Sequence, residues 1–260
     1  MPKANKKLRI AVDAMGGDYA PAEIVKGAIL AAQKDDVEIA LVGPTKILER
    51  ELAKYNPPHN LPIYKVQADE VVEEGESPAF VVRRKPNSSM AVAAKLVKSG
   101  EVDAMVSAGA SGAVAVSAIQ FIGMLDGMGR PAIGGTLGSF APNTVVMDLG
   151  ANVDCKPHQL LAFATAGSVF AEKFLHIPNP TVGLLSTGAE EGKGNEVVRE
   201  SYSLLKNSSL NFIGNIEGND ILSGRANVII CDGFVGNVLV KFYESIGPYA
   251  LEWIKQRLKN

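Results

Sequence analysis

The sequence predicts an α/β protein with a mostly parallel sheet covered by helices on both faces. Short apolar runs such as Leu8–Val12 and Ile39–Val42 alternate with segments of helical periodicity. These runs are continuously apolar, which is typical of strands buried on both faces. The 260 residues, 47% of them hydrophobic, supply material for a sizeable core. We expect one α/β domain over residues 1–260, or alternatively two lobes joined by the Gly/Pro-rich segment 123–143.

Strand and helix units follow one another along the chain. The first is a strand over Leu8–Val12, a loop, and a helix opened by Pro21 with Ile24, Ala28 and Leu30 on one side. Further strands are expected at Ile39–Val42, Ala104–Val106, Thr144–Met147, Thr181–Leu185, Asn211–Gly214 and Val228–Cys231. Helices are expected over Pro44–Tyr55, after Gly109, after Pro157, over Glu190–Leu205 and from about Phe234. In segment 123–143 an antiparallel excursion is the alternative to a connection.

Composition excludes several classes of protein. The net charge of −2 provides no global field for nucleic acid or an anionic membrane, so an anion site must be local. Cys155 and Cys231 lack the spacing of a zinc site or a disulfide framework, and we expect no metal. The basic start lacks the apolar core of a signal peptide, so a cytoplasmic location is expected. The uncharged stretch 104–125 contains three glycines and is interpreted as strand, turn and helix rather than a membrane span.

Four loops that follow strands share one design, in which small residues precede a polar residue and a helix start. They are the segments 13–18, 107–112, 186–195 and 231–237. Glycine allows the backbone to approach a ligand, and a helix N-terminus presents unpaired N–H groups to an anion such as phosphate. One such loop alone would most simply be a tight turn. Four of them in one chain favour a binding site at the carboxyl ends of the strands.

Known motifs do not fit these loops. The segment 188–194 is one residue short of a Walker A loop and lacks the Ser/Thr after lysine, and no GxGxxG follows the first strand. Lys193 stands between two glycines at an expected helix start, where a cation is unfavourable unless it shares a bound anion. A solvated loop lysine is the equal alternative. Asn237 follows Gly236 at another expected helix start, where it fits either an N-cap or a donor to an oxyanion.

Acidic residues and asparagines also gather at strand ends, where each fits a ligand or a turn former. They are Asp13, Asp18, Asp148, Asn152, Asp154 and Asp232. The densest basic run is Arg83, Arg84 and Lys85, for which a solvated face is the default and an acidic partner the alternative.

Seven segments together resemble the bacterial phosphate acyltransferase family of phospholipid synthesis (PlsX). They are 11–21, 76–78, 82–90, 148–155, 190–195, 211–218 and 231–237, in one order over almost the whole chain. The resemblance implies a homodimeric fold like that of phosphotransacetylases and isopropylmalate dehydrogenases, needing no metal, nucleotide or other cofactor. It implies transfer of a fatty acyl group from acyl carrier protein to inorganic phosphate, with the acyl phosphate passing to a membrane glycerol-3-phosphate acyltransferase.

Site residues follow from the loops and the resemblance together. The resemblance assigns catalytic roles to Lys193 and Asn237. Expected phosphate and substrate contacts are Asp13, Gly16, Gly17, Asp18, Ser107, Gly109, Ser111, Gly112, Asn152, Asp154, Gly194, Asn195, Asp232 and Gly233. The chain departs from the family pattern at Ala110, Ser111, Ala189 and Asn219. The family continues beyond the position of Asn260, so we expect the C-terminal part of its fold to be absent.

Other functions stay open at this point. A phosphotransacetylase-like enzyme using acyl-CoA would use the same loops, because both donors are thioesters. A decarboxylating dehydrogenase would need a metal-binding acid cluster that the sequence does not supply. A non-catalytic membrane scaffold would rest on an amphipathic helix from Tyr249, with Trp253 and Ile254 on its apolar side. Packing against protein is the first expectation for that helix, and peripheral membrane contact is the alternative.

Overall fold

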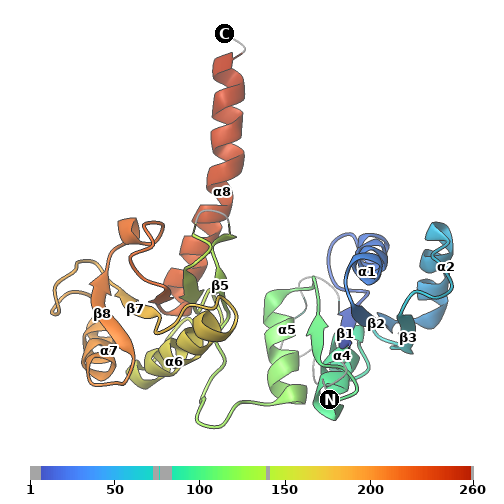
Figure 1. Ribbon diagram of the computed structural model, residues 1–260, viewed down its shortest axis with the longest axis horizontal. Helices are drawn as coiled ribbons and strands as arrows, with labels where there is room; N and C mark the ends of the chain where they lie inside the picture. Colours follow the sequence, from blue (N-terminus) through green and yellow to red (C-terminus); the bar gives the residue numbers. More distant parts are fainter. Residues whose placement is uncertain (1–6, 73–75, 77–83, 139–140, 259–260) are drawn as a thin grey trace, which may run out of the picture. The chain divides into compact units, whose positions relative to one another are not determined.

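The computed structural model describes residues 7–72, 76, 84–138 and 141–258, and the chain divides into two units, Met1–Gly123 and Met124–Asn260 (Figure 1). Each unit has its own sheet and its own core. The units are described separately below.

A four-stranded parallel sheet forms the centre of unit 1, in the order β3-β2-β1-β4. Its strands are β1 (Leu8–Asp13), β2 (Val37–Gly43), β3 (Ile63–Gln67) and β4 (Ala104–Val106). β2 is the most apolar of them and is buried from Ile39 onward, as expected for a central strand.

Helices cover both faces of this sheet. They are α1 (Ala22–Lys34), α2 (Thr45–Tyr55), α4 (Ser89–Ser99), α5 (Ser111–Ser117) and the π-helical turn η1 (Ala118–Ile122). On one face Val25 and Ile29 of α1 pack with Ile39 and Leu41 of β2. On the other face Ala93 of α4 packs with the alternate strand residues. The period-2 alternation of the strands therefore separates two apolar clusters.

Unit 2 contains a five-stranded mixed sheet in the order β5-β6-β9-β7-β8. Its strands are β5 (Gly134–Thr136), β6 (Val145–Met147), β7 (Thr181–Leu185), β8 (Asn211–Ile216) and β9 (Val228–Ile230). Only β5 pairs antiparallel, with β6. All three residues of β6 and of β9 are buried, so these central strands are apolar on both sides.

The helices of unit 2 again lie on both faces. They are α6 (Pro157–Lys173), α7 (Glu196–Lys206), the short 3₁₀ turn η3 (Gly218–Asp220) and α8 (Gly233–Leu258). Phe163 of α6 and Leu205 of α7 belong to the larger cluster, with Leu184 and Ile230. On the opposite face Leu239 and Tyr243 of α8 pack with Ile229. The C-terminal half of α8 extends beyond the rest of unit 2 (Figure 1).

The predicted fold class is confirmed, with several corrections to individual elements. The helix predicted from Glu190 begins at Glu196, because Asn195 is its N-cap. β3 was not predicted, since its residues alternate and are only partly buried. β5 is the antiparallel excursion that was the alternative for segment 123–143, although Gly134 and Gly135 are poor strand formers. Leu30 does not lie on the buried side of α1 and is 45% exposed.

Candidate functional site

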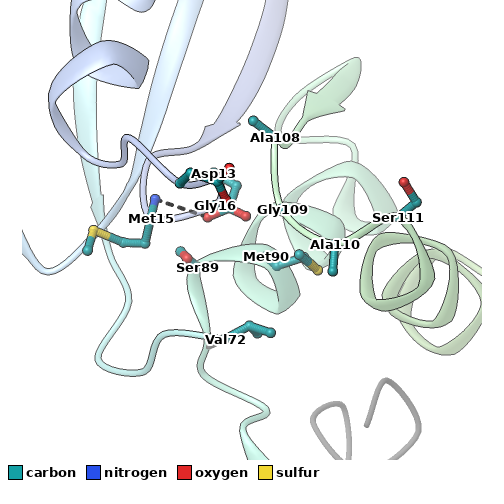
Figure 2. A pocket seen from close by; sticks show the side chains of 12 residues that line it. Asp13, Met15, Gly16, Val72, Ser89, Met90, Ala108, Gly109, Ala110 and Ser111 are labelled. Carbon is teal, nitrogen blue, oxygen red and sulfur yellow. Dashed lines mark hydrogen bonds between the residues drawn. The ribbon is translucent and has the colours of Figure 1, made fainter. Parts of the chain in front are cut away.

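A polar pocket of about 280 Å³ lies at the carboxyl ends of β1 and β4 in unit 1 (Figure 2). Its walls come from the loops after these strands, from the start of α4 and from one residue after β3. The lining residues are Asp13, Met15, Gly16, Gly17, Asp18, Val72, Ser89, Met90, Ala108, Gly109, Ala110 and Ser111. This is the edge at which open α/β sheets bind ligands.

Asp13 links the two loops of this pocket. Its side chain is 1% exposed, and one carboxylate oxygen accepts a hydrogen bond from the Ser107 hydroxyl at 2.7 Å. The other oxygen accepts from the Met15 N–H at 3.2 Å, drawn as a dashed line in Figure 2. The Ser107 oxygen in turn accepts from the Gly109 N–H at 3.1 Å. A buried carboxylate needs such partners, so the Asp13–Ser107 pair holds together loops 94 residues apart.

Gly16 lies where these loops touch. A Cβ atom at this position would lie 2.6 Å from Asp13 Oδ2 and 2.9 Å from the Gly109 nitrogen. Gly17 adopts φ +105°, a conformation that side chains rarely allow, and lies against Ala108. The close contact between the loop after β1 and the loop after β4 therefore depends on the absence of a side chain at Gly16.

The charge of this pocket limits what it binds. Among the described residues its lining contains the carboxylates of Asp13 and Asp18 and no lysine or arginine. Ser89 is buried at the first turn of α4, whose N-cap Ser88 accepts from the Ala91 N–H at 3.3 Å. An anion here would be held by backbone N–H groups and hydroxyls rather than by a side-chain cation.

A second pocket, of about 230 Å³, lies at the carboxyl ends of β7 and β9 in unit 2. The starts of α7 and α8 and the loop 186–195 surround it. The lining residues are Leu160, Leu184, Leu185, Ser186, Thr187, Gly194, Asn195, Val197, Val198, Cys231, Asp232 and Val235. Each unit thus carries a pocket at the carboxyl ends of its strands.

Lys193 lies in the loop beside this second pocket and not at a helix start. Its N–H donates to the Glu190 carbonyl at 3.0 Å, and α7 begins only at Glu196. A Cβ atom at Gly188 would lie 2.9 Å from Lys193 Cγ, so Gly188 leaves room for the lysine stem. Lys193 therefore precedes the N-cap Asn195 by two residues, rather than lying in the first turn of the helix.

Asn237 lies within the first turns of α8 and is not the N-cap. Asp232 has that role, since its Oδ1 accepts from the Val235 N–H at 2.8 Å. The exposed side chain of Asn237 faces Gly150, where a Cβ atom would lie 3.5 Å from Asn237 Oδ1. Gly150 itself has φ +133°. The Asn237 amide thus lies over a glycine turn.

A buried carboxylate, Asp148, organises the loop beneath α8. It is fully buried with φ +69°, and it accepts from the Ala151 N–H at 2.8 Å and from Asn152 Nδ2 at 3.0 Å. Asn152 Nδ2 also donates to the Pro131 carbonyl at 2.7 Å. The sequence analysis left Asp148 as either a ligand or a turn former and did not include it among the expected substrate contacts. The sequence signal that could have identified Asp148 is the glycine two residues after it in the segment Asp148-Leu-Gly150. In the structure this glycine has a positive φ.

Two glycines bring α8 onto this loop. A Cβ atom at Gly233 would lie 2.7 Å from backbone atoms of Asn152, and one at Gly236 would lie 2.0 Å from the Asp148 carbonyl oxygen. Burial, helped by the neighbouring Asp148 carboxylate, raises the pKa of the Cys155 thiol to about 11. The two cysteines are free and buried, and stay as neutral thiols at neutral pH.

The predicted site residues fall into two groups. Asp13, Gly16, Gly17, Asp18, Gly109 and Ser111 line the pocket of unit 1, Ser107 bonds to Asp13, and Gly112 lies inside α5. Gly194, Asn195 and Asp232 line the pocket of unit 2, and Lys193 and Gly233 adjoin them in the chain. Asn152 and Asn237 lie instead where α8 meets the loop after β6, and Asp154 is exposed. The four similar loops therefore form two pairs. Loops 13–18 and 107–112 meet in unit 1, and loops 186–195 and 231–237 meet in unit 2.

The basic run is only partly within the described residues. Arg83 lies outside them. Lys85 Nζ donates to Glu76 Oε2 at 2.7 Å and to the Val71 carbonyl at 2.8 Å. Lys85 therefore holds its own loop together. In the described part of the chain no group of three or more His, Cys, Asp or Glu side chains could hold a metal ion, and no helix is long and apolar enough to cross a membrane.

Solved structures with this fold include acyl-transferring enzymes. The EutD phosphotransacetylase from Staphylococcus aureus superposes with a TM-score of 0.65 at 19% identity, covering 94% of this chain and 83% of that chain. A branched-chain phosphotransacylase from Enterococcus faecalis gives a TM-score of 0.58 at 14% identity, covering 92% and 85%. At this identity the likeness shows the fold alone, and it confirms the phosphotransacetylase-like architecture expected above.

Sequence relatives are much closer. A phosphate acyltransferase of Pelotomaculum thermopropionicum is 48% identical over 253 residues, covering 97% of this chain and 73% of that protein. One from Aquifex aeolicus is 50% identical over 253 residues, covering 97% and 75%. The family model described as fatty acid synthesis protein matches residues 8–260. With nearly its whole length matched, the chain belongs to the fatty acid synthesis protein family.

Proposed function

We propose that this chain transfers an acyl group from acyl carrier protein to inorganic phosphate. The observation that carries the proposal is 48% identity, over 97% of the chain, to a protein named phosphate acyltransferase. The product would be an acyl phosphate, a substrate for a membrane glycerol-3-phosphate acyltransferase. In unit 2 the glycine-rich loop 186–195 is consistent with an anionic substrate, and the apolar walls of the adjoining pocket are consistent with an acyl donor.

The reaction needs little from the protein beyond binding and charge stabilisation. A phosphate oxygen attacks the thioester carbonyl carbon, and the tetrahedral oxyanion collapses with cleavage of the carbon–sulfur bond. The thiolate leaves on the carrier and takes up a proton. Phosphate is already an anion at neutral pH, so no strong general base is required.

Lys193 is proposed to bind the phosphate anion, and Asn237 is proposed to stabilise the oxyanion of the tetrahedral intermediate. Lys193 lies between Gly192 and Gly194, so its ammonium group and the surrounding amides would hold phosphate. The Asn237 amide would donate a hydrogen bond to the developing oxyanion, because its side chain is exposed over Gly150.

Kinetics with purified protein test this proposal. We expect phosphate-dependent loss of acyl carrier protein thioester, and a fall in kcat of about 100-fold in Lys193→Ala and in Asn237→Ala. Lys173→Ala is the control, because Lys173 is an exposed lysine on α6 paired only with its neighbour Glu172. Near-normal turnover in both variants would remove them from the mechanism. Acyl-CoA run in parallel identifies the donor, and a preference for it would support the phosphotransacetylase-like alternative.

The carrier is proposed to dock at Arg83, Arg84 and Lys85. Acyl carrier proteins are acidic, and a local basic patch can direct such a partner even on a near-neutral protein. Arg84→Glu should weaken carrier binding more at low salt than at high salt, while the KM for phosphate stays unchanged. Unchanged affinity at every salt concentration would place the docking surface elsewhere.

The protein is also proposed to act in the cytoplasm with peripheral contact to the membrane, where its apolar product is used. Trp253 and Ile254 on α8 are 60% and 46% exposed, and Lys255 lies beside them. Such a helix can lie in the headgroup region of a bilayer. Flotation with anionic vesicles should be weak in the parent protein and lost in Trp253→Glu and Ile254→Glu variants that fold normally. A parent protein that does not float would contradict the membrane contact.

A further inference from the structure

The pocket of unit 2 has apolar walls and a polar rim. Its walls are formed by Leu160, Leu184, Val197, Val198 and Val235, of which Leu160 and Leu184 are almost fully buried. Thr187, Asn195 and Asp232 stand at its polar side. Apolar surface that stays open to water in a folded chain gains free energy when an apolar ligand covers it.

The apolar walls of this pocket are less suited to an anion than is the loop around Lys193. Both helices that begin at it are already capped by their own side chains. Asn195 Oδ1 accepts from the Val198 N–H at 2.9 Å, and Asp232 Oδ1 accepts from the Val235 N–H at 2.8 Å. The Asp232 carboxylate also places negative charge at the rim. An uncharged, apolar group fits these walls better than phosphate does.

The position of the pocket relates it to the proposed chemistry. Gly194 in its wall directly follows Lys193, and Val235 precedes Asn237 by two residues on the same turn of α8. A group bound between these walls therefore lies next to the loop of Lys193, whereas Asn237 points to another side of α8, toward Gly150. At about 230 Å³ the pocket is smaller than the ~300–1,000 Å³ that encloses a whole drug-sized ligand, so it would hold only part of a long chain.

A second apolar cavity, in unit 1, is the competing location. It has about 390 Å³ and runs along α1, between Ile24, Gly27 and Ala31 and the strand residues Ile10 and Val12. This groove follows the face of the sheet. The pocket of unit 2 instead lies at the carboxyl ends of strands, where ligands bind in this class of fold.

We infer that the unit 2 pocket receives the part of the donor's acyl chain nearest the thioester. The inference rests on the proposed function, since it presumes an acyl thioester as donor. The walls Val197, Val198 and Val235 would enclose the first methylene groups, while the thioester carbonyl stays at the polar side near Gly194 and the adjoining Lys193.

A pair of valine variants on α8 tests the inference. Val235→Phe places a ring at the mouth of the pocket, and Val235 is 39% exposed, so the fold can accept it. The matched control is Val238→Phe, since Val238 lies on the same helix, is 56% exposed and does not line the pocket. Equal Tm values in the two variants would verify folding.

The readout is the ratio of kcat/KM for a 4-carbon donor to that for a 2-carbon donor, which lacks the first methylene groups. Val235→Phe should lower this ratio about tenfold, because each displaced methylene group changes binding about fourfold. Val238→Phe should leave it unchanged. An unchanged ratio in Val235→Phe, with turnover intact, would overturn the inference and leave the proposed function standing.

Photolabelling gives an answer that does not require turnover. The probe is a pantetheine thioester of a fatty acid with a diazirine near the carbonyl. We expect saturable labelling of peptides spanning 184–198 and 231–238, and its loss in Val235→Phe. Labelling of 24–39 instead, or no saturable labelling, would overturn the inference. Absence of phosphate-dependent turnover together with labelling at the expected peptides would count against the proposed function alone.

Discussion

At the scale of single residues, Gly16 controls the contact between the two loops of unit 1. Alanine there would bring a Cβ atom within 2.6 Å of Asp13 Oδ2 and 2.8 Å of Ser107 Oγ. The Asp13–Ser107 hydrogen bond would have to lengthen or break, and we expect the free energy of unfolding to fall by about 1–3 kcal/mol. Urea unfolding measures this change.

Gly27→Ala is the control for Gly16→Ala. Gly27 lies inside α1, and a Cβ atom there would meet nothing within 4 Å. Alanine favours helix over glycine, so this variant should gain about 0.5–1 kcal/mol. Equal effects of the two substitutions would show that the loop contact is looser than these distances indicate.

The two cysteines should make stability depend on alkaline pH. Burial, with added effects of Asp148 and Asp232, raises the pKa of Cys155 to about 11 from an ordinary 9.0, and burial also raises the pKa of Cys231. A folded-state pKa above the unfolded value stabilises the fold at lower pH, and that contribution is lost as pH rises from 9 toward the folded pKa. The free energy of unfolding should therefore decline above pH 9.

Urea unfolding at pH 8 and at pH 10.5 checks the sign of this effect. Lysines and tyrosines titrate in the same range, so the informative quantity is the difference from a Cys155→Ala variant, whose decline should be smaller. Iodoacetamide at pH 8 should also leave both thiols of the folded protein unmodified. Rapid alkylation under native conditions would contradict the assigned burial.

At the scale of elements, the start of α8 is fixed by contact with the loop after β6. Gly236→Ala would place a Cβ atom 2.0 Å from the Asp148 carbonyl oxygen, and a backbone atom cannot move aside as a side chain can. We expect a loss of about 3 kcal/mol or more, because α8 must shift away from the sheet. Thermal unfolding would record it as a large fall in Tm.

Gly247→Ala provides the comparison within the same helix. A Cβ atom at Gly247 meets nothing within 4 Å, so only helix propensity changes and the variant should be neutral or slightly more stable. If Gly236→Ala were as stable as Gly247→Ala, the close approach of α8 to Asp148 would not exist in solution.

At the scale of the whole molecule, α8 carries a row of largely exposed apolar side chains. Spacings of three and four residues place its members on one side of the helix. They are Val235, Val238, Phe242, Ile246, Tyr249 and Trp253, each 39% exposed or more. This row is consistent with the homodimer that we propose from the resemblance, because exposed apolar stripes mark protein or membrane contacts.

Sedimentation tests whether this row holds two copies together. Phe242→Glu should raise the dimer dissociation constant by about 100-fold or more, since the ring is central in the row and a buried carboxylate has no partner there. Leu251→Glu makes a similar change on the opposite side of α8, where Leu251 is 53% exposed, and should leave the dimer intact. A monomeric parent protein, or equal effects of both variants, would contradict the dimer.

The sequence by itself determined the fold class and most of the elements. Runs such as Ile39–Val42 and Val228–Cys231 are continuously apolar, so they predict buried parallel strands without any knowledge of their neighbours. Glycine loops after strands likewise placed the candidate site at the carboxyl ends. The helix start after Lys193 was misplaced by six residues, because Glu190 and Glu191 favour helix while the cap at Asn195 decides where it begins.

Only the tertiary structure decided which loops meet. Hydrophobic periodicity is a local property and does not fix the order of strands in a sheet. The strand pairing β1–β4 brings Asp13 to Ser107, 94 residues away, and the pairing β6–β9 brings Asp148 beneath Gly236. The capping of both helices by Asn195 and Asp232 likewise depends on hydrogen bonds that residue types allow but do not specify.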